Sequence, residues 1–415
     1  MTAGAMAKAH AAPAAAAAEE GVPRLGVLRF AALGALMAVG AVATDMYLPA
    51  MPTMAAALHA APGRMELTVS AYLIGFSLGQ LLWGPVGDKH GRKWPVAAGL
   101  ALFVAGSVGC ALSGTVGGLV GWRVVQALGA CAGPVLARAM VRDLYAGERS
   151  ASVLSTLMTV MAGAPLIAPL LGGQVLALWS WRGIFWAIAG FGLLALAGLL
   201  SLPETLPQSR RNTQRFGAAL AGYAALARSP RLLGFALAGG FFYAGIFAYI
   251  AGTPFAYIEY YHVPAQAYGL LFGAAIVGIM GTNLLNARLV TRFGTDWLVR
   301  FGTAVAAVAG VAAAVDARFG WGGLAGLAAL LFIYTAMSGL IVANSVAGAL
   351  AAHPNKAGTA SALLGAMHYG SGVLSAAAVG WLADGTPGPM TWIIAAGGVG
   401  SFLSVLLLVR PAAPT

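Results

Sequence analysis

Runs of mainly apolar residues, separated by short polar clusters, extend along the chain from residue 26 to residue 409. A helix needs about 20 such residues to cross the ~30 Å core of a bilayer, whereas a spanning β-strand alternates over about ten residues. The sequence shows long runs and no alternating segments. The pattern predicts membrane-spanning helices near residues 26–50, 66–84, 95–113, 116–138, 152–178, 183–202, 232–257, 267–287, 298–315, 321–346, 357–382 and 390–409.

The composition excludes an ordinary soluble domain. Hydrophobic residues make up 60% of the 415 residues and charged residues only 8%, against about 25% charged residues in soluble domains. The apolar runs are rich in Ala, Leu and Gly, which favours helices packed through small residues. Cys110 and Cys131 lie inside such runs, so neither a disulfide framework nor a metal site is expected. The fold class is therefore all-α, with twelve membrane-spanning helices.

The basic residues indicate how these helices are oriented. The net charge is +11, and most Lys and Arg residues lie in segments on the same side as the N-terminus, notably 89–93, 138–149, 210–231 and 288–300. Cytoplasmic loops are enriched in Lys and Arg, so both termini are predicted to be cytoplasmic. The charge is a topology signal, and no nucleic-acid partner is expected.

The longest polar stretch after the N-terminal tail divides the chain in two. We expect a disordered cytoplasmic tail at 1–24, a six-helix bundle at 25–203, a cytoplasmic linker at 204–231 and a second six-helix bundle at 232–410. A faint repeat of 84–91 at 287–294 supports two related halves. Repeated halves with a site between them are typical of transporters.

The first apolar run has a second interpretation. Arg24 precedes it, and the Ala-Val-Ala stretch at 41–43 is similar to the cleavage site of a signal peptide. However, the run continues to Leu58. A retained helix is therefore expected.

Asp45 and Arg123 lie deep within predicted spans, where each charge costs about 2.5–3.5 kcal/mol on insertion scales and is a functional candidate. Asp45 lies in the outer half of 26–50, and Arg123 lies at a similar depth in 116–138. Burial favours a neutral carboxyl group and a nearby cation favours a charged one, so Asp45 paired with Arg123 is a candidate reversible proton carrier. The alternatives are an Asp45 wetted at a helix end and an Arg123 that braces backbone carbonyls.

His368 lies near the middle of the predicted span 357–382. A free histidine titrates near neutral pH, although a lone one among apolar residues is more often neutral and hydrogen-bonded. With His368, we take Tyr47, Gln126 and Met161 as candidate lining of a substrate pocket, because aromatic and flexible apolar surfaces suit varied ligands.

The segment 84–93 is rich in glycine and charge. Glycine permits a tight turn, and Asp88 can accept hydrogen bonds from a helix N-terminus and pair with an arginine across the halves. Such a charge latch would favour one global state over another; a solvated basic loop is the alternative. The candidate latch residues are Gly84, Asp88, Lys89, Gly91 and Arg92.

The predicted span 152–178 carries Pro165 and Pro169, followed by Gly172 and Gly173. Proline removes a backbone donor and bends a helix, while glycine permits close helix packing. The motif indicates either a functional bend or an ordinary kinked span.

These motifs resemble those of the major facilitator superfamily, in particular its twelve-helix drug:proton antiporters. The segment 84–93 matches the superfamily pattern G-x-x-x-D-(R/K)-x-G-(R/K)-(R/K) at every defined position. Arg123-x-x-Gln126 is similar to the motif linked with proton coupling. Residues 165–173 resemble the antiporter motif ending G-P-x-x-G-G, with Ala168 in place of its first glycine.

Three further segments, 44–50, 138–143 and 181–185, resemble the Bcr/CflA branch, which exports bicyclomycin, chloramphenicol and florfenicol-type compounds. The second half departs from the pattern at two positions. Thr291 occupies the Asp position of the repeated loop, and His368 stands where the branch usually has glutamine.

The resemblance implies an inner-membrane exporter that exchanges protons for a small organic compound by alternating access. It implies no bound cofactor, a proton gradient as energy source, and the lipid bilayer, protons and a small-molecule substrate as partners of a monomer. An exporter of one metabolite class, such as nucleosides or amino-acid-like solutes, is the alternative. An enzyme is not expected, because the sequence has no H-E-x-x-H, no Gly-x-Ser-x-Gly and no paired intramembrane carboxylates.

Overall fold

The computed structural model describes residues 26–145, 147–211, 229–351 and 357–409. The predicted tail 1–24 and most of the predicted linker 204–231 lie outside these residues. Each half of the chain is helical. The first half comprises α2 (Val27–Asp45), η1 (Leu48–Ala50), α3 (Met51–Ala57), α4 (Leu67–His90), α5 (Lys93–Leu112), α6 (Val116–Leu144), α7 (Gly147–Leu178), α8 (Trp181–Leu200) and η2 (Gln208–Arg210). The second comprises α10 (Pro230–Pro254), η3 (Phe255–Tyr260), α11 (Ala265–Phe293), α12 (Thr295–Phe319), α13 (Gly323–Ala336), α14 (Ser338–Ala351), α15 (Ala357–Trp381) and α16 (Gly388–Leu408).

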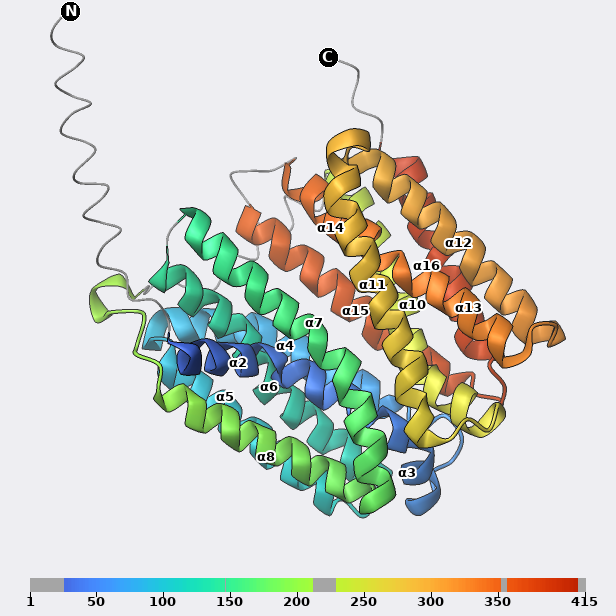
Figure 1. Cartoon of the computed structure of the whole chain (residues 1–415), viewed down its shortest axis with the longest axis horizontal. Coiled ribbons are helices and arrows are strands. Elements are labelled where there is room, and N and C mark those ends of the chain that lie inside the picture. Colours follow the sequence, from blue (N-terminus) through green and yellow to red (C-terminus); the bar gives the residue numbers. More distant parts are fainter. Residues whose placement is uncertain (1–25, 146, 212–228, 352–356, 410–415) are drawn as a thin grey trace, which may run out of the picture.

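The helices form two bundles that lie side by side (Figure 1). In the first bundle α6 packs against α4 and α5, and in the second α16 packs against α10 and α12. Between the bundles, α4 packs against α15 and α7 packs against α11. These two helix pairs therefore carry most of the contact between the halves.

Successive helices run back and forth between two ends of the molecule. We call the end that carries residues 91–93 and 201–211 the latch end. We call the opposite end, which carries α3, residues 58–66 and residues 382–387, the vestibule end. Within the described residues, eleven helices are long and apolar enough to cross a membrane. Helix α15 adds another of 25 residues, which agrees with the predicted number of spans.

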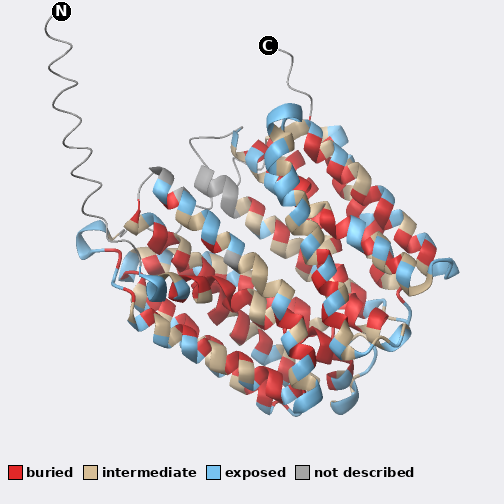
Figure 2. Ribbon diagram, in the orientation of Figure 1, coloured by how far each residue is buried: buried red, intermediate tan, exposed pale blue. Residues whose placement is uncertain are grey.

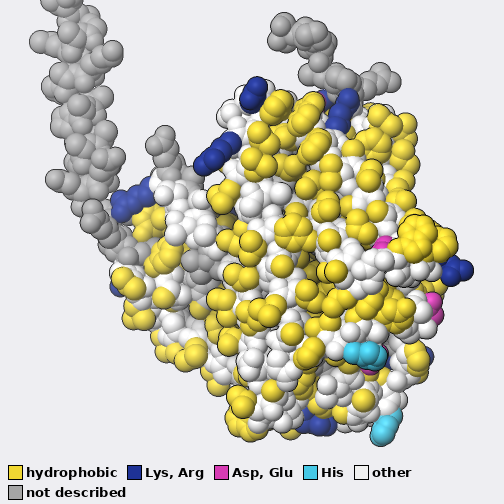
Figure 3. All heavy atoms as spheres, turned by 45° about the vertical axis from the view of Figure 1, so that its right-hand side comes forward, with side chains coloured by type: hydrophobic (Ala, Val, Ile, Leu, Met, Phe, Trp, Pro, Cys, Tyr) yellow, Lys and Arg dark blue, Asp and Glu magenta, His cyan; other side chains and the backbone are white. Residues whose placement is uncertain are grey.

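The outer surface of the bundles is apolar. Large apolar side chains such as Leu194, Leu284 and Leu374 are exposed on helix sides, while buried residues follow the inner faces of the bundles (Figure 2). Figure 3 shows hydrophobic side chains across the middle of one face, with most of its Lys and Arg side chains toward the top of the view. An apolar belt of this size requires lipid rather than water around it.

Several helices are longer than the sequence predicts. Helix α4 ends at His90 instead of residue 84, α6 at Leu144 instead of 138, and α11 at Phe293 instead of 287. Hydropathy marks where the apolar run stops, but the backbone hydrogen bonds of a helix continue into polar surroundings. The predicted span 321–346 is two helices, because at Met337 the N–H bonds to a carbonyl only three residues back.

The bundles approach closely where α7 meets α11 at the vestibule end. A Cβ atom at Gly173 would lie 2.9 Å from the carbonyl oxygen of Ala265. The preceding Gly172 faces the opposite side, against the backbone carbonyl of Met46. Both glycines of the predicted motif therefore permit backbone contact, one between the halves and one within the first half.

The variant Gly173→Leu should force α7 away from α11. We expect a loss of about 1–3 kcal/mol of stability, the usual penalty for overpacking, measured as a lower unfolding temperature in detergent by intrinsic fluorescence. Gly163→Leu is the matched control on the same helix, since a Cβ atom there meets nothing within 4 Å. Equal unfolding temperatures for the two variants would contradict the close contact at Gly173.

Candidate functional site

A cavity of about 460 Å³ lies between the two bundles. It extends from the depth of Asp45 toward the latch end, because Arg138 on its wall lies only six residues before the end of α6. Both halves contribute to its lining. From the first half come Met37, Gly40, Ala41, Thr44, Asp45, Tyr72, Leu73, Phe76, Gln80, Pro134, Arg138, Met161, Ala162 and Pro165, and from the second Phe247, Ile250, Val346, Leu364, Gly365, His368 and Tyr369.

Asp45 is placed at the cavity by the end of helix α2. Pro49 has no N–H to donate to the Asp45 carbonyl, and its ring would clash with that carbonyl in a continuous helix. The α-helix accordingly ends at Asp45, and the chain continues through η1, which contains Pro49. Asp45 is 5% exposed and lines the cavity. The structure therefore places the predicted carboxylate between the halves and away from bulk solvent.

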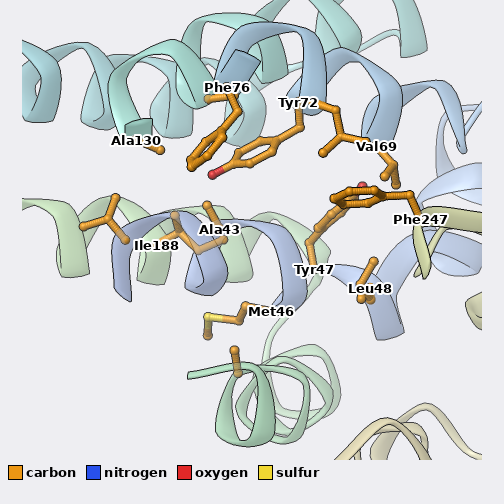
Figure 4. Close-up of a cluster of buried hydrophobic side chains, with 14 of the residues drawn as sticks. Ala43, Met46, Tyr47, Leu48, Val69, Tyr72, Phe76, Ala130, Ile188 and Phe247 are labelled. Atoms are coloured by element: carbon orange, nitrogen blue, oxygen red, sulfur yellow. The ribbon is translucent and has the colours of Figure 1, made fainter. Parts of the chain in front are cut away.

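Arg123 lies behind this wall, inside the first bundle, and is fully buried. Its guanidinium carbon lies 4.1 Å from the ring centroid of Tyr47 and 4.3 Å from that of Tyr72. Such cation–π contacts stabilise a cation most strongly where water is excluded. Figure 4 shows Tyr72 on α4 near the end of α2, with Ala43 on the last turn of that helix and Tyr47 in the turn that follows it.

Hydrogen bonds fix one side of the Arg123 guanidinium. Nη1 donates to the carbonyl oxygen of Ala43 (2.9 Å) and to Oε1 of Gln126 (2.7 Å). The Gln126 amide in turn donates to Ser107 Oγ at 2.9 Å. Among the described residues, Nε and Nη2 of Arg123 have no hydrogen-bond partner. A buried cation with two free donors is an incomplete arrangement.

The expected direct pair between Asp45 and Arg123 is not formed in this conformation. Within the described part of the chain, no ion pair joins them within 4.0 Å. The carbonyl that Arg123 binds, that of Ala43, lies two residues before Asp45 on the last turn of α2. The pairing hypothesis is therefore wrong for this state, and Arg123 is braced by a carbonyl, an amide and two aromatic rings.

The candidate pocket residues divide into two groups. Met161 and His368 line the cavity. The His368 ring stacks on Tyr243 with centroids 4.5 Å apart, and its Nε2 has no hydrogen-bond partner among the described residues. Tyr47 and Gln126 are outside the cavity lining and contact Arg123 instead. They therefore belong to the support of the cation rather than to the pocket wall.

Sequence reasoning missed the aromatic wall of the cavity. Phe76 and Tyr369, from opposite halves, lie with ring centroids 5.3 Å apart, and Phe247 lies 6.1 Å from Tyr369. Aromatic residues occur in many of the apolar runs, so composition could not show which ones face the cavity. Arg138 also lines the cavity, although its position at the polar end of the predicted span 116–138 gives no sign of this.

The predicted latch residues form a charged cluster at the latch end. Arg92 donates from Nη1 to Asp88 (2.6 Å) and from Nε to Asp143 (2.8 Å). Among the described residues, Asp88 pairs with Arg92 of its own bundle and with no arginine of the other half, which differs from the expected partner. The turn is also shorter than expected. Gly84 and the exposed Lys89 lie within α4, and only Gly91, with φ of 92°, has a backbone that favours glycine.

Glu204 completes this cluster and was not predicted. Its carboxylate accepts from the backbone N–H groups of Arg92 (2.8 Å), Lys93 (3.1 Å) and Leu206 (2.9 Å). Burial opposes ionisation, but these hydrogen bonds outweigh it and hold the pKa of Glu204 below its usual range. The carboxylate thus caps the start of α5, where a helix N-terminus favours negative charge.

The lowered pKa gives a testable pH dependence. The stability contributed by Glu204 is present at neutral pH and is lost as the carboxylate protonates in acid. We expect Glu204→Gln to unfold at a lower temperature than the wild-type protein at pH about 7, and the difference to shrink as the pH falls below about 4.3, the usual pKa of glutamate. Thermal unfolding across this pH range measures it. A difference that does not change with pH would contradict the assignment.

Comparison with known proteins identifies the family to which the chain belongs. Residues 33–376 match the Major Facilitator Superfamily. The MFS-type transporter YdgK of Bacillus subtilis (strain 168), an uncharacterized protein, is 36% identical over 336 residues, which cover 80% of this chain and 83% of YdgK. A bicyclomycin resistance protein homolog of Haemophilus influenzae is 30% identical over 381 residues, covering 91% and 94%. A chloramphenicol resistance protein of Pseudomonas aeruginosa is 30% identical over 338 residues, covering 79% and 78%.

Solved structures show the same fold. A crystal structure of a mutant of the nucleoside transporter NupG superposes with a TM-score of 0.75 at 13% identity, over 92% of this chain and 98% of that one. The xylose transporter XylE of E. coli, in a partially occluded inward-open conformation, gives 0.71 at 17% identity, over 92% and 96%. With the family match and the relatives above, these likenesses confirm the resemblance: the chain is a multi-pass membrane transporter of the Major Facilitator Superfamily, similar to the Bcr/CflA drug-resistance proteins, and not an enzyme.

Proposed function

We propose that this transporter is a proton-coupled antiporter that exports small organic compounds across the bacterial inner membrane, with both termini in the cytoplasm. One observation carries the proposal: a carboxylate, Asp45, lines a cavity between the halves beside a buried arginine whose donors are not all used. Compounds such as amphenicols or bicyclomycin are the proposed substrates, since relatives are named for resistance to bicyclomycin and chloramphenicol.

Coupling would arise because a proton and a ligand compete for the Asp45 carboxylate. When Asp45 is ionised it can accept hydrogen bonds from a ligand in the cavity or turn toward the free donors of Arg123. Protonation removes this negative charge and weakens both interactions. Arg123 cannot lose its own proton, so its charge stays constant and the carboxyl group is the one that titrates.

Alternating access would move these groups between the two sides of the membrane. In this conformation the bundles contact at the vestibule end, through Gly173 and Ala265 among other residues, while the cavity extends toward the latch end. With the latch end in the cytoplasm, this is an inward-facing arrangement. Rocking of the bundles would break the contacts at the vestibule end and close the cavity at the other end.

A proton gradient would supply the energy, with no bound cofactor. An elementary charge that crosses the membrane gains about 2.3 kcal/mol per 100 mV. That amount is enough to bias a cycle whose two states differ by a few kcal/mol. The charge cluster of Asp88, Arg92 and Asp143 would favour one state by holding α4, α5 and α6 in one arrangement.

The cavity wall bears on the breadth of substrates. Phe76, Phe247 and Tyr369 offer aromatic surface, which suits varied apolar compounds. His368 Nε2 packs against Gly239 of α10 and offers no selective contact to a ligand, so export of one metabolite class stays the alternative without an observation that favours it. Competition assays with chemically unrelated compounds separate these two alternatives.

Replacing Asp45 tests the proposed proton carrier. In proteoliposomes with an imposed pH gradient, we expect Asp45→Asn to reduce gradient-driven chloramphenicol flux to that of protein-free liposomes, because the amide cannot take up or release a proton. The matched control is Asp296→Asn, on α12 at the latch end, which pairs with Arg231 and lies outside the cavity lining. Unchanged gradient-driven flux in Asp45→Asn would refute the assignment of the carrier.

Replacing Arg123 tests its proposed role as the cationic partner of Asp45. We expect Arg123→Ala to abolish coupled flux and Arg123→Lys to restore it only weakly, since an ammonium group cannot lie between two rings and bind Gln126 as a guanidinium does. Flux per folded protein, with folding checked by gel filtration, is the measurement. Normal transport by Arg123→Ala would remove Arg123 from the mechanism.

A further inference from the structure

A second cavity, of about 660 Å³, lies at the vestibule end and is separate from the one that contains Asp45. Its walls come from α3 and the following loop, from α10 and η3, and from the connection between α15 and α16. Cavities of this size hold small organic molecules. We refer to it as the vestibule.

Glu66 is the most buried charged residue of the vestibule. It precedes α4, is 4% exposed, and its Oε2 has no hydrogen-bond partner among the described residues. A buried carboxylate oxygen without a donor is unfavourable by itself, so the site is incomplete without a group that donates to it.

The other charged side chains of the vestibule are also acidic. Glu259 on η3 is exposed, and Asp384 accepts through Oδ1 from the N–H and the hydroxyl of Thr386. The remaining titratable group on the wall is His59; no Lys or Arg belongs to the described lining. Arg64, two residues from Glu66, is exposed to solvent and lies outside the lining. The field of the vestibule therefore favours a cation.

Contact between the halves holds Glu66 in place. The backbones of Gly63 and Gly380 touch, and a Cβ atom at Gly380 would lie 3.3 Å from Cβ of Glu66. Gly63, with φ of 77°, has a backbone that favours glycine. The loop that carries Glu66 is therefore pressed against α15 of the other half, and Glu66 lines a cavity whose walls come from both halves.

We propose that the vestibule is a binding site for a protonated organic amine, with an ammonium N–H donating to Oε2 of Glu66. Glu259 and Asp384 add long-range attraction for the cation. Met65, Phe255 and Met390 supply apolar surface for the organic part of the ligand. A donor is required by the free oxygen, so an amine with an N–H fits better than a quaternary ammonium ion. This site does not depend on which compound crosses the central cavity.

Protons should compete with the amine. Burial raises the pKa of Glu66 above its usual range, and the Glu259 carboxylate adds to the rise. The amine binds the ionised form, so its affinity should fall as the pH decreases through the range in which Glu66 protonates. The other charged or titratable groups of the vestibule wall are those named above.

The test uses a cysteine as reporter. Ala56 lines the vestibule and is exposed, whereas the native Cys110 and Cys131 are buried. The rate at which N-ethylmaleimide labels Ala56→Cys in the purified full-length protein is measured with 2-phenylethylamine, or with 2-phenylethanol as its neutral analogue. The amine should slow labelling, with weaker protection at lower pH, and the alcohol should not. Equal protection by the two compounds would overturn the proposal.

Variants of the acidic residues complete the test. In the Ala56→Cys protein, the further change Glu66→Gln should raise the amine concentration needed for half-maximal protection about ten-fold or more. This is the effect expected for loss of a hydrogen bond between charged groups. Glu66→Asp should retain partial protection. Asp296→Asn, which removes one acidic charge at the opposite end, should leave protection unchanged. Wild-type protection in Glu66→Gln would overturn the proposal, and if that variant does not fold, the amine and alcohol comparison still decides.

Discussion

The buried charge of Arg123 is the constraint on which the rest of this structure depends. A guanidinium cannot be neutralised in a membrane interior, so the protein must surround it with groups that replace water. Tyr47 and Tyr72 cover its faces, and Gln126 and the Ala43 carbonyl accept from one of its nitrogens. The arrangement still leaves Nε and Nη2 free of partners among the described residues. An environment that only partly satisfies a fixed charge is one in which a nearby carboxylate has two alternatives, to approach the cation or to face the cavity.

The two positions open to the Asp45 carboxylate link the site to the arrangement of the two bundles. Pro49 ends α2 at Asp45, so the carboxylate lies on the last turn of a helix rather than inside it, and the same turn supplies the carbonyl that Arg123 binds. A small rotation of this turn changes what Asp45 faces. Met46 follows Asp45 in the chain and packs against Gly172 of α7. Gly173, the residue after Gly172, contacts α11 of the other half. Movement between the bundles is thus connected to the position of Asp45 by adjacent backbone contacts.

The sequence was informative where membrane physics restricts the choice of residue. The apolar runs predicted the helices, and the rarity of charge within them singled out Asp45 and Arg123, both of which the structure places beside the cavity or just behind it. The sequence did not predict the features that depend on tertiary packing. Nothing in the pattern showed that Tyr47 and Gln126 would support the cation, that Phe76 and Tyr369 would form the wall, or that Glu204 would cap α5. Helix ends were misplaced because hydropathy follows the bilayer and not the hydrogen bonds. The Asp88 partner was misassigned because a single sequence does not show which arginine is near.

Proton release on ligand binding tests the central claim most directly. If a ligand in the cavity and a proton compete for Asp45, then adding chloramphenicol to the purified protein in weakly buffered detergent solution should release protons in proportion to the ligand bound. A pH indicator dye measures this release, and the Asp45→Asn protein, with ligand binding followed separately, should bind without releasing protons. Binding by the wild-type protein without release, or equal release by the Asp45→Asn protein, would contradict the account.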